Sequence, residues 1–212
     1  MQNTDQITIR GLAFNDLPAM MECEEAAWPA DVRATEDQLR ERLEVFPEGC
    51  FGAWKGSDLV GMTTCQLVNY QPSDGLISWS DLCADGSIRR THQPAGNCVH
   101  FISTGVRPEV RGHRVGTLLN QARLELGRAK GADFALADTR LPGMARFLAE
   151  DPGRTAQDYL DAVLDDRVHD PVVRMYRNLG LEPLGLIASC MKSDVESAHY
   201  GLGMIYRYHR LA

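Results

Sequence analysis

Residues 104–119 place two glycines and three basic side chains where a β-type run meets an amphipathic segment. Gly112 and Gly116 let the backbone turn tightly and come close to a ligand. The first amides of a helix that begins here have no partners inside the helix, and the positive end of the helix attracts anions. The junction therefore predicts an anion-binding site, with phosphate as the expected ligand.

The glycine spacing distinguishes this loop from a nucleotide P-loop, which has four residues between its glycines and then Lys and Ser or Thr. Three residues separate Gly112 from Gly116, and Thr117 follows directly without a lysine. Nucleotide hydrolysis is therefore excluded. One alternative stays open, namely a strand, a solvated loop and a surface helix whose arginines bind nothing, because glycine and basic residues before a helix are common.

The loop resembles the acyl-CoA pyrophosphate loop of the GCN5-related N-acetyltransferase (GNAT) superfamily. It reads Val106-Arg-Pro-Glu-Val-Arg-Gly-His-Arg-Val-Gly116, and the usual family form is Val-x-Pro-x-x-Arg-Gly-x-Gly-Ile-Gly. The resemblance implies acetyl-CoA as the acyl donor. Arg114 stands where the middle glycine usually lies, so its side chain either clashes with the phosphates or contacts them. The cofactor-binding residues that the resemblance implies are Thr104, Val106, Arg111, Gly112, His113, Arg114, Val115, Gly116 and Thr117.

A second segment, residues 172–181, is similar to the family pattern Ala-x-x-Leu-Tyr-x-x-x-Gly-Phe, whose tyrosine protonates the coenzyme A sulfur. By this match Tyr176 is the expected general acid. A phenol is protonated at neutral pH and can hydrogen-bond a thiolate, so the chemistry is reasonable. The alternative is that Tyr176 only packs on the buried stripe of its helix with Val172 and Val173.

His100 is the expected general base. It lies six residues before Val106, so alternation along a strand predicts that both face the same side, where histone-type members of the family carry a glutamate. An imidazole can take a proton from an ammonium group directly or through water. A satisfied histidine inside the sheet is the alternative, and Asp138 is the rival base. We expect Trp79, Asp81 and Asp138 to bind a cationic amine substrate.

Caps, turn residues and hydrophobic periodicity predict the elements that position these residues. The expected strands are 7–10, 51–54, 59–68, 99–106, 134–137, 184–187 and 204–208, with 76–79 as a short strand-like segment. The expected helices end near Ala27, begin at Thr35, precede Gly131, begin at Thr155 and cover 172–178. The stripe predicted to be buried on the helix before Gly131 consists of Val115, Leu118, Leu119, Ala122, Leu126 and Ala129.

This order agrees with the fold that the GNAT resemblance implies, an α/β (α+β) domain with a mixed, mostly antiparallel sheet flanked by helices. We expect one domain over residues 1–212, with insertions at about 71–97 and 140–169. Segment 139–143, Thr-Arg-Leu-Pro-Gly, together with the helical insert before Asp170, also resembles a GNAT subgroup that is sometimes fused to carbon–nitrogen hydrolases.

Composition sets further limits. The chain has 212 residues, of which 44% are hydrophobic and 24% charged, as in an ordinary globular protein. A net charge of -7 argues against general binding of nucleic acids or anionic membranes and suits a cationic substrate. The first residues lack the pattern of a signal peptide, and no apolar run approaches a membrane span, so a cytoplasmic location is expected. The six cysteines have no Cys-x-x-Cys spacing, so neither a disulfide framework nor a metal site is expected.

The expected function is therefore acetyl-CoA-dependent N-acetylation of a small-molecule or peptide amine by direct attack in a ternary complex. A catalytically silent acyl-CoA-binding regulatory domain is the alternative, which Arg114 keeps open. A third alternative is an enzyme of another class that holds a different anion at the same helix end. The oligomeric state is left open by the sequence, with pairing of edge strands at the C-terminal end as one route to a homodimer.

Overall fold

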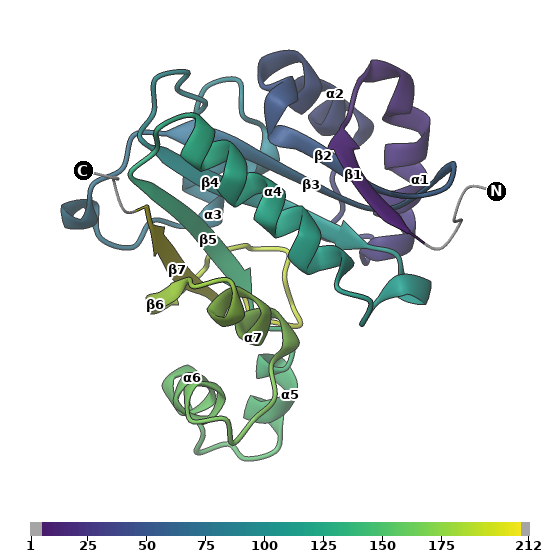
Figure 1. Cartoon of the computed structure of the whole chain (residues 1–212). Helices are drawn as coiled ribbons and strands as arrows, with labels where there is room; N and C mark the ends of the chain where they lie inside the picture. The colour runs from purple at the N-terminus through teal and green to yellow at the C-terminus, as the bar shows by residue number, and fades with distance from the viewer. Residues whose placement is uncertain (1–5, 209–212) are drawn as a thin grey trace.

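The computed structural model describes residues 6–208 and contains a seven-stranded sheet with the order β1-β2-β3-β4-β5-β7-β6 (Figure 1). The strands are β1 (Ile7–Gly11), β2 (Cys50–Lys55), β3 (Asp58–Val68), β4 (Cys98–Val106), β5 (Phe134–Arg140), β6 (Glu182–Ile187) and β7 (Gly201–Arg207). Neighbouring strands are antiparallel except β4 and β5, which are parallel. The expected mixed, mostly antiparallel fold is confirmed.

Helices cover both faces of this sheet. They are α1 (Leu17–Ala27), α2 (Glu36–Val45), α3 (Trp79–Cys83), α4 (Val115–Ala129), α5 (Met144–Ala149), α6 (Ala156–Leu164) and α7 (Pro171–Asn178). Alternation along β2 separates the two layers, because Cys50 packs with α1 and α2 whereas Phe51 and Ala53 pack with α4. Figure 1 shows α4 lying along the sheet, while α5 and α6 stand away from it. Among the residues described, no helix is long and apolar enough to cross a membrane.

Local signals account for most helix starts. The Thr35 hydroxyl accepts a hydrogen bond from the Gln38 amide, and the Thr155 hydroxyl accepts one from the Asp158 amide, so capping boxes mark both helix starts expected at these threonines. The Asp170 carboxylate accepts from the first amides of α7, directly before the proline that opens that helix. The Asp170 cap therefore fixes the start of α7, the helix that carries Tyr176, the expected general acid.

Two expectations about the insertions fail. Residues 76–79 do not form a strand; instead Trp79 opens α3, and the Ser78 hydroxyl accepts from the amide of Asp81 to cap it. The hydrogen bond to Ser78 therefore stabilises a helix start here, despite the β-propensity of the neighbouring apolar residues. Helix α5 was not expected, because its short apolar segment has no side-chain cap to announce it.

The two central strands separate at one end. Pairing between β4 and β5 stops at Phe101 and Ala137, although β4 continues along β3 to Val106 and β5 continues along β7 to Arg140. The C-terminal parts of β4 and β5 therefore diverge and open a wedge between them.

A β-bulge lies at the start of the wedge. Thr64 pairs with Ser103 and Cys65 with Phe101, so Ile102 is an extra residue on β4. Because the extra residue reverses the alternation, His100 and Val106 lie on opposite faces. The expectation that they share a side is wrong, since it assumed an uninterrupted strand.

Candidate functional site

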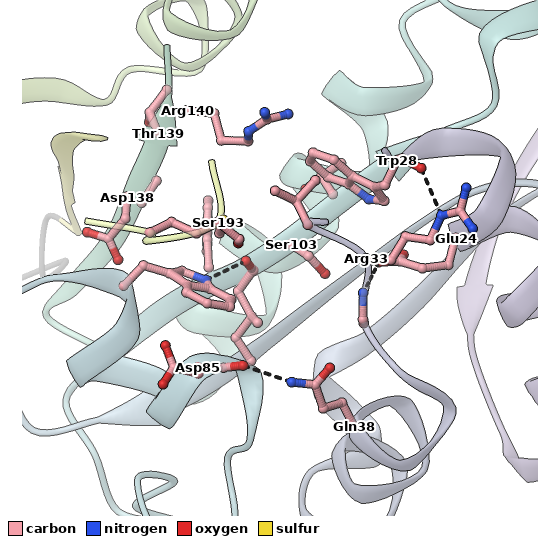
Figure 2. A pocket seen from close by; sticks show the side chains of 18 of the residues that line it. Glu24, Trp28, Arg33, Gln38, Asp85, Ser103, Asp138, Thr139, Arg140 and Ser193 are labelled. Atoms are coloured by element: carbon pink, nitrogen blue, oxygen red, sulfur yellow. Dashed lines mark hydrogen bonds between the residues drawn. The ribbon is translucent and has the colours of Figure 1, made fainter. Parts of the chain in front are cut away.

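A cavity of about 390 Å³ opens at this wedge. Its walls come from β4 and β5, from the connection between α1 and α2, from α3, and from the loop at 188–200. Figure 2 shows Trp28 and Glu24 on one wall facing Asp138, Thr139 and Arg140 on another. Elements that lie far apart along the chain thus enclose a single cavity with both apolar and polar lining residues.

The cavity collects polar atoms that have no protein partner. Seven buried side-chain nitrogen or oxygen atoms lack a hydrogen bond in the described part of the chain, and four of them belong to residues that line this cavity. These four are Glu24 Oε2, Trp28 Nε1, Arg123 Nε and Thr139 Oγ1. Because buried polar groups are normally paired, this concentration indicates a cavity built to receive a polar ligand.

The loop at 188–200 is fastened over the cavity by Arg140. Its guanidinium donates two hydrogen bonds of 2.6 Å to Asp194, whose carboxylate also accepts from the Ser197 hydroxyl. Burial would raise the pKa of Asp194, but the hydrogen bonds from Arg140 and Ser197 outweigh it and hold the pKa below its usual value. The loop therefore carries Met191 and Ser193 into the lining as a fixed wall.

The anion-binding loop leads from β4 into α4. Helix α4 has no side-chain cap, and its first internal hydrogen bond runs from the amide of Leu118 to the carbonyl of Arg114. The amides of Val115, Gly116 and Thr117 therefore precede the hydrogen-bonded ladder of the helix, where a ligand anion can receive them. Thr117 and Gly116 are half-buried, so this end of the helix is reachable.

Arg114 adopts the left-handed conformation, with φ of 63°. Any residue other than glycine is strained in this conformation, which explains why the GNAT loop usually has glycine where this chain has Arg114. His113 and Arg114 are exposed, whereas Arg111 donates to the carbonyls of Val106 (3.1 Å) and Ala27 (2.8 Å). Arg111 thus ties the loop to the end of α1, and the backbone amides are left as the principal anion donors.

We expect Arg114→Gly to stabilise the protein. A left-handed L-residue costs about 1–2 kcal/mol, which exceeds the added chain entropy of glycine by roughly 0.5–1 kcal/mol. Thermal denaturation should therefore show a melting temperature about 1–4 °C higher. Gly112→Ala is the matched change in the opposite direction, because Gly112 has φ of 84°, and it should lower the melting temperature. A lower melting temperature for Arg114→Gly would contradict this view of the loop.

Tyr176 reaches the cavity from α7, where it is buried. Its hydroxyl oxygen accepts a hydrogen bond from Arg123 Nη2 at 3.3 Å, and its ring lies 6.2 Å from that of Phe101. No acceptor for the hydroxyl hydrogen occurs within residues 6–208. The geometry leaves Tyr176 able to donate its proton to a ligand atom in the cavity.

His100 lies behind the cavity wall. It has no exposed surface and does not line the cavity, whereas its partner Asp138 does. The Gln66 side-chain amide faces Nδ1 at 3.2 Å while also donating to the carbonyl of Leu82, so Nδ1 is the acceptor and Nε2 carries the proton. Nε2 then donates to Asp138 Oδ2 over 2.8 Å. In this arrangement His100 holds Asp138 in place and has no free nitrogen for a substrate.

Of the other two residues expected to bind the substrate, Trp79 lies at the cavity and Asp81 does not. Trp79 lines the cavity, and its Nε1 donates to the carbonyl of Ile102 at 2.9 Å. Asp81 is exposed, accepts a hydrogen bond from the Ser78 hydroxyl and is not part of the lining. Asp85, four residues later, does line the cavity.

Sequence reasoning missed three charged residues of the site, Glu24, Arg42 and Arg123. All three are buried and lie on the inward stripes of α1, α2 and α4. On α4 the buried positions are Val115, Leu119, Asn120, Arg123, Leu124 and Gly127, so the expected stripe with Leu118, Ala122, Leu126 and Ala129 was rotated toward the solvent. The sequence signal that could have identified them is a charged residue three or four positions from apolar residues on the buried face of the same helix.

Glu24 is the most distinctive of the three. It is 2% exposed, its Oε1 accepts from the amide of Ala34 at 2.8 Å, and its Oε2 has no partner in the described chain. Burial raises the pKa of Glu24, although the amide of Ala34 and the charges of Arg42 and Arg33 oppose the shift. A carboxyl with a raised pKa and a free oxygen in a cavity is suited to proton transfer.

Comparison with known proteins identifies the family to which the chain is similar. The sequence profile of the Acetyltransferase (GNAT) family matches residues 17–147. A protein of Bacillus subtilis (strain 168) named "Uncharacterized N-acetyltransferase YkwB" is 27% identical over 207 residues, which cover 96% of this chain and 89% of that protein. "Probable hydrolase YhcX" of the same organism is 25% identical over 195 residues; the match covers 92% of this chain but 37% of YhcX.

Two solved structures share the fold over most of their length. One is a GphF GNAT-like decarboxylase in complex with isobutyryl-CoA, with a TM-score of 0.77 and 26% identity, covering 94% of this chain and 98% of the other. The second is the loading GNATL domain of CurA from Lyngbya majuscula, with a TM-score of 0.80 and 17% identity, covering 96% and 98%. The second likeness shows the fold alone.

Proposed function

Because the chain belongs to the acetyltransferase (GNAT) family, we propose that it transfers an acetyl group from acetyl-CoA to a primary amine of a small molecule or peptide. The single observation that supports this most is that Tyr176 and Glu24, whose Oε2 has no partner in the described chain, line one cavity at the wedge between β4 and β5. An acid and a proton acceptor in one cavity are what direct attack in a ternary complex requires. We take the chain to act as one domain.

The residues around the wedge fit coenzyme A. The amides of Val115, Gly116 and Thr117 stand free at an uncapped helix end, as a pyrophosphate needs. At Gly112 no atom lies within 4 Å of the place where a Cβ would be, so the loop leaves room for the phosphates. Thr104 and Val106 lie on β4 beyond its last pairing with β5, where backbone groups can meet the pantetheine amides.

Acetyl-CoA supplies an activated acyl group; the chain's residues handle the protons. The amine nitrogen bonds to the acyl carbon and the carbon–sulfur bond breaks. Glu24 accepts the proton that the amine loses, directly or through a water molecule, and Tyr176 Oη gives its proton to the departing sulfur. The two transfers balance, because the proton held by Glu24 returns to solvent as Tyr176 is reprotonated.

In this scheme Asp138 binds the amine substrate. Its carboxylate lines the cavity and is oriented by the Nε2 proton of His100, so it offers a negative charge to an ammonium group before reaction. His100 becomes a positioning residue, which changes the role expected from the sequence. Trp79 adds an apolar ring to the same wall, so the acceptor is expected to carry both a cationic and an apolar part.

The test is to incubate the protein with acetyl-CoA and a panel of amines while following release of free thiol. Amine-dependent release is the expected result. Tight binding of acetyl-CoA without release above background for any amine would instead support the catalytically silent binding domain. Calorimetry with acetyl-CoA run beside the thiol assay separates these two outcomes.

The similarity to GphF favours a second candidate, loss of carbon dioxide from a carboxylated acyl-CoA, since 26% identity extends over 94% of the chain. In that reaction the bond between the carboxylate and the α-carbon breaks, carbon dioxide leaves, and Tyr176 would protonate the α-carbon. Mass spectrometry of malonyl-CoA incubated without any amine decides this. Conversion to acetyl-CoA supports the second candidate, and an unchanged thioester removes it.

A further inference from the structure

Two arginines from opposite layers meet beside the wedge. Arg42 comes from α2 and Arg123 from α4; they are 2% and 0% exposed, and both line the cavity. Arg42 Nη1 donates to the hydroxyls of Thr64 and Ser103, while Arg123 Nη1 donates to the carbonyls of the same two residues. The β-bulge thus brings two buried guanidinium groups to one pair of neighbouring residues.

Every other partner of these guanidinium groups is neutral too. Arg42 donates twice to the carbonyl of Gly86, and Arg123 donates to the Thr104 hydroxyl (2.7 Å), the Asn120 side chain and Tyr176. Neutral acceptors satisfy most of the N–H groups, and the centroid of the Phe101 ring lies 3.7 Å from the guanidinium carbon of Arg123, but no opposite charge compensates either arginine. Burial accordingly lowers the pKa of both guanidinium groups.

No carboxylate compensates them. Among residues 6–208, none lies within the 4.0 Å ion-pair distance of either arginine. Glu24 is the acid whose charge acts most on Arg42, but burial raises the pKa of Glu24 and so favours its neutral form. Even when ionised, Glu24 offsets one of the two positive charges, and Asp138, which lines the same cavity, forms no ion pair with either arginine. The arginine pair itself therefore retains a positive charge that is costly without an anion.

Arg140 in the same cavity shows what a compensated arginine looks like. It has two carboxylate partners, Asp194 at 2.6 Å and Glu196 at 3.1 Å. The chain therefore pairs one cavity arginine fully and leaves two deeply buried ones unpaired. One of those two, Arg123, also has an Nε that meets no partner in the described chain.

We propose that Arg42 and Arg123 form an anion subsite that binds a carboxylate of the ligand, and that this carboxylate belongs to the acyl group of a further donor that the site accepts besides acetyl-CoA, a short dicarboxylic half-thioester such as malonyl- or succinyl-CoA. The assignment to the acyl group rests on the proposed function, because Arg123 contacts Tyr176, which that function places at the thioester sulfur. A carboxylate one or two carbons from the thioester carbonyl is then within reach of the arginines.

Ligand comparison tests the subsite without altering the protein. Calorimetry should show malonyl-CoA binding about 10- to 100-fold more tightly than acetoacetyl-CoA, its neutral isostere, because a charged hydrogen-bonded pair is lost. Free malonate, compared with chloride at equal ionic strength, should raise the melting temperature by about 2–4 °C, a measurement that does not depend on coenzyme A. Equal affinities together with no effect of malonate would overturn the subsite.

Variants assign the effect to residues. Arg42→Gln and Arg123→Gln should abolish the preference for malonyl-CoA, and Arg123→Lys should keep most of it. Arg40→Gln is the matched control, because Arg40 lies on the same helix as Arg42 but pairs with Glu36 outside the cavity lining, and it should leave the ratio unchanged. Should the glutamine variants not fold, the wild-type ratio and Arg123→Lys still decide, because a retained charge must retain a preference. A preference lost equally in Arg40→Gln would overturn the assignment.

A separate arm identifies the source of the carboxylate. With acetyl-CoA as the donor, alanine and alaninamide are compared as acceptors. Discrimination there, with none between the thioesters, would move the carboxylate to the acceptor and overturn the donor assignment. Failure of the proposed function is distinguishable, since absent amine-dependent thiol release leaves the malonate effect intact.

Discussion

Tyr176→Phe should reduce kcat by about 10²- to 10⁴-fold while the affinity for acetyl-CoA changes little. The substitution removes only the hydroxyl, so the ring keeps its packing against Phe101. It also removes the donor that protonates the departing sulfur, which is needed in the transition state and not in binding. Steady-state kinetics of thiol release, with calorimetry for the binding of acetyl-CoA, measure both quantities.

Tyr70→Phe is the matched control for this loss of a buried hydroxyl. Tyr70 is 3% exposed, and its hydroxyl donates weakly to the carbonyl of Gly75 at 3.4 Å, away from the cavity lining. Its kcat should stay near that of the wild type. If Tyr176→Phe behaved like Tyr70→Phe, Tyr176 would be a packing residue, the alternative that its sequence context leaves open.

Glu24→Gln should lower kcat by about 10²- to 10⁴-fold and remove the acidic limb of the pH–rate profile. Glu24 accepts a proton only when it is ionised, so activity should rise as the pH rises through its pKa. An exposed glutamate has a pKa of about 4.3. Because burial raises the pKa of Glu24, the acidic limb should lie at a higher pH than that value. Glutamine keeps the acceptor for the amide of Ala34 and nearly the same volume, so the fold is expected to persist.

Glu41→Gln provides the comparison for this change. Glu41 accepts hydrogen bonds from the Ser87 hydroxyl and from two backbone amides, but it does not line the cavity. Its loss should change stability and leave the shape of the pH–rate profile unaltered. A Glu24→Gln enzyme that retained the acidic limb would point to Asp138 as the proton acceptor.

Much of the fold was predictable because its signals are local. Thr35, Thr155 and Asp170 cap helices through residues that lie two or three positions further along the chain. Glycines at left-handed positions, such as Gly131 and Gly180, end helices where expected. The loop before α4 was recognisable for the same reason, since a contiguous segment supplies all its backbone amides.

The site was less predictable because its geometry depends on contacts between distant segments. The bulge at Ile102 results from the pairing of β4 with β3, and it alone places His100 behind the wall rather than in the cavity. Glu24, Arg42 and Arg123 look like solvated charges in the sequence, since their burial depends on which face each helix turns to the sheet. Periodicity predicted α4 as a helix but missed the rotation of its buried face.

The hydrogen bond from Trp79 to the carbonyl of Ile102 has a consequence for how the protein can diversify. It fastens the 71–97 insertion to the strand that carries the bulge, and the amide of Ser80 also donates to the carbonyl of Cys190 in the loop over the cavity. The 71–97 segment, the loop over the cavity and the central strand are thus interlocked rather than modular. Exchanging one segment with a relative should therefore disturb the other, so a new acceptor preference would have to evolve through paired changes in both.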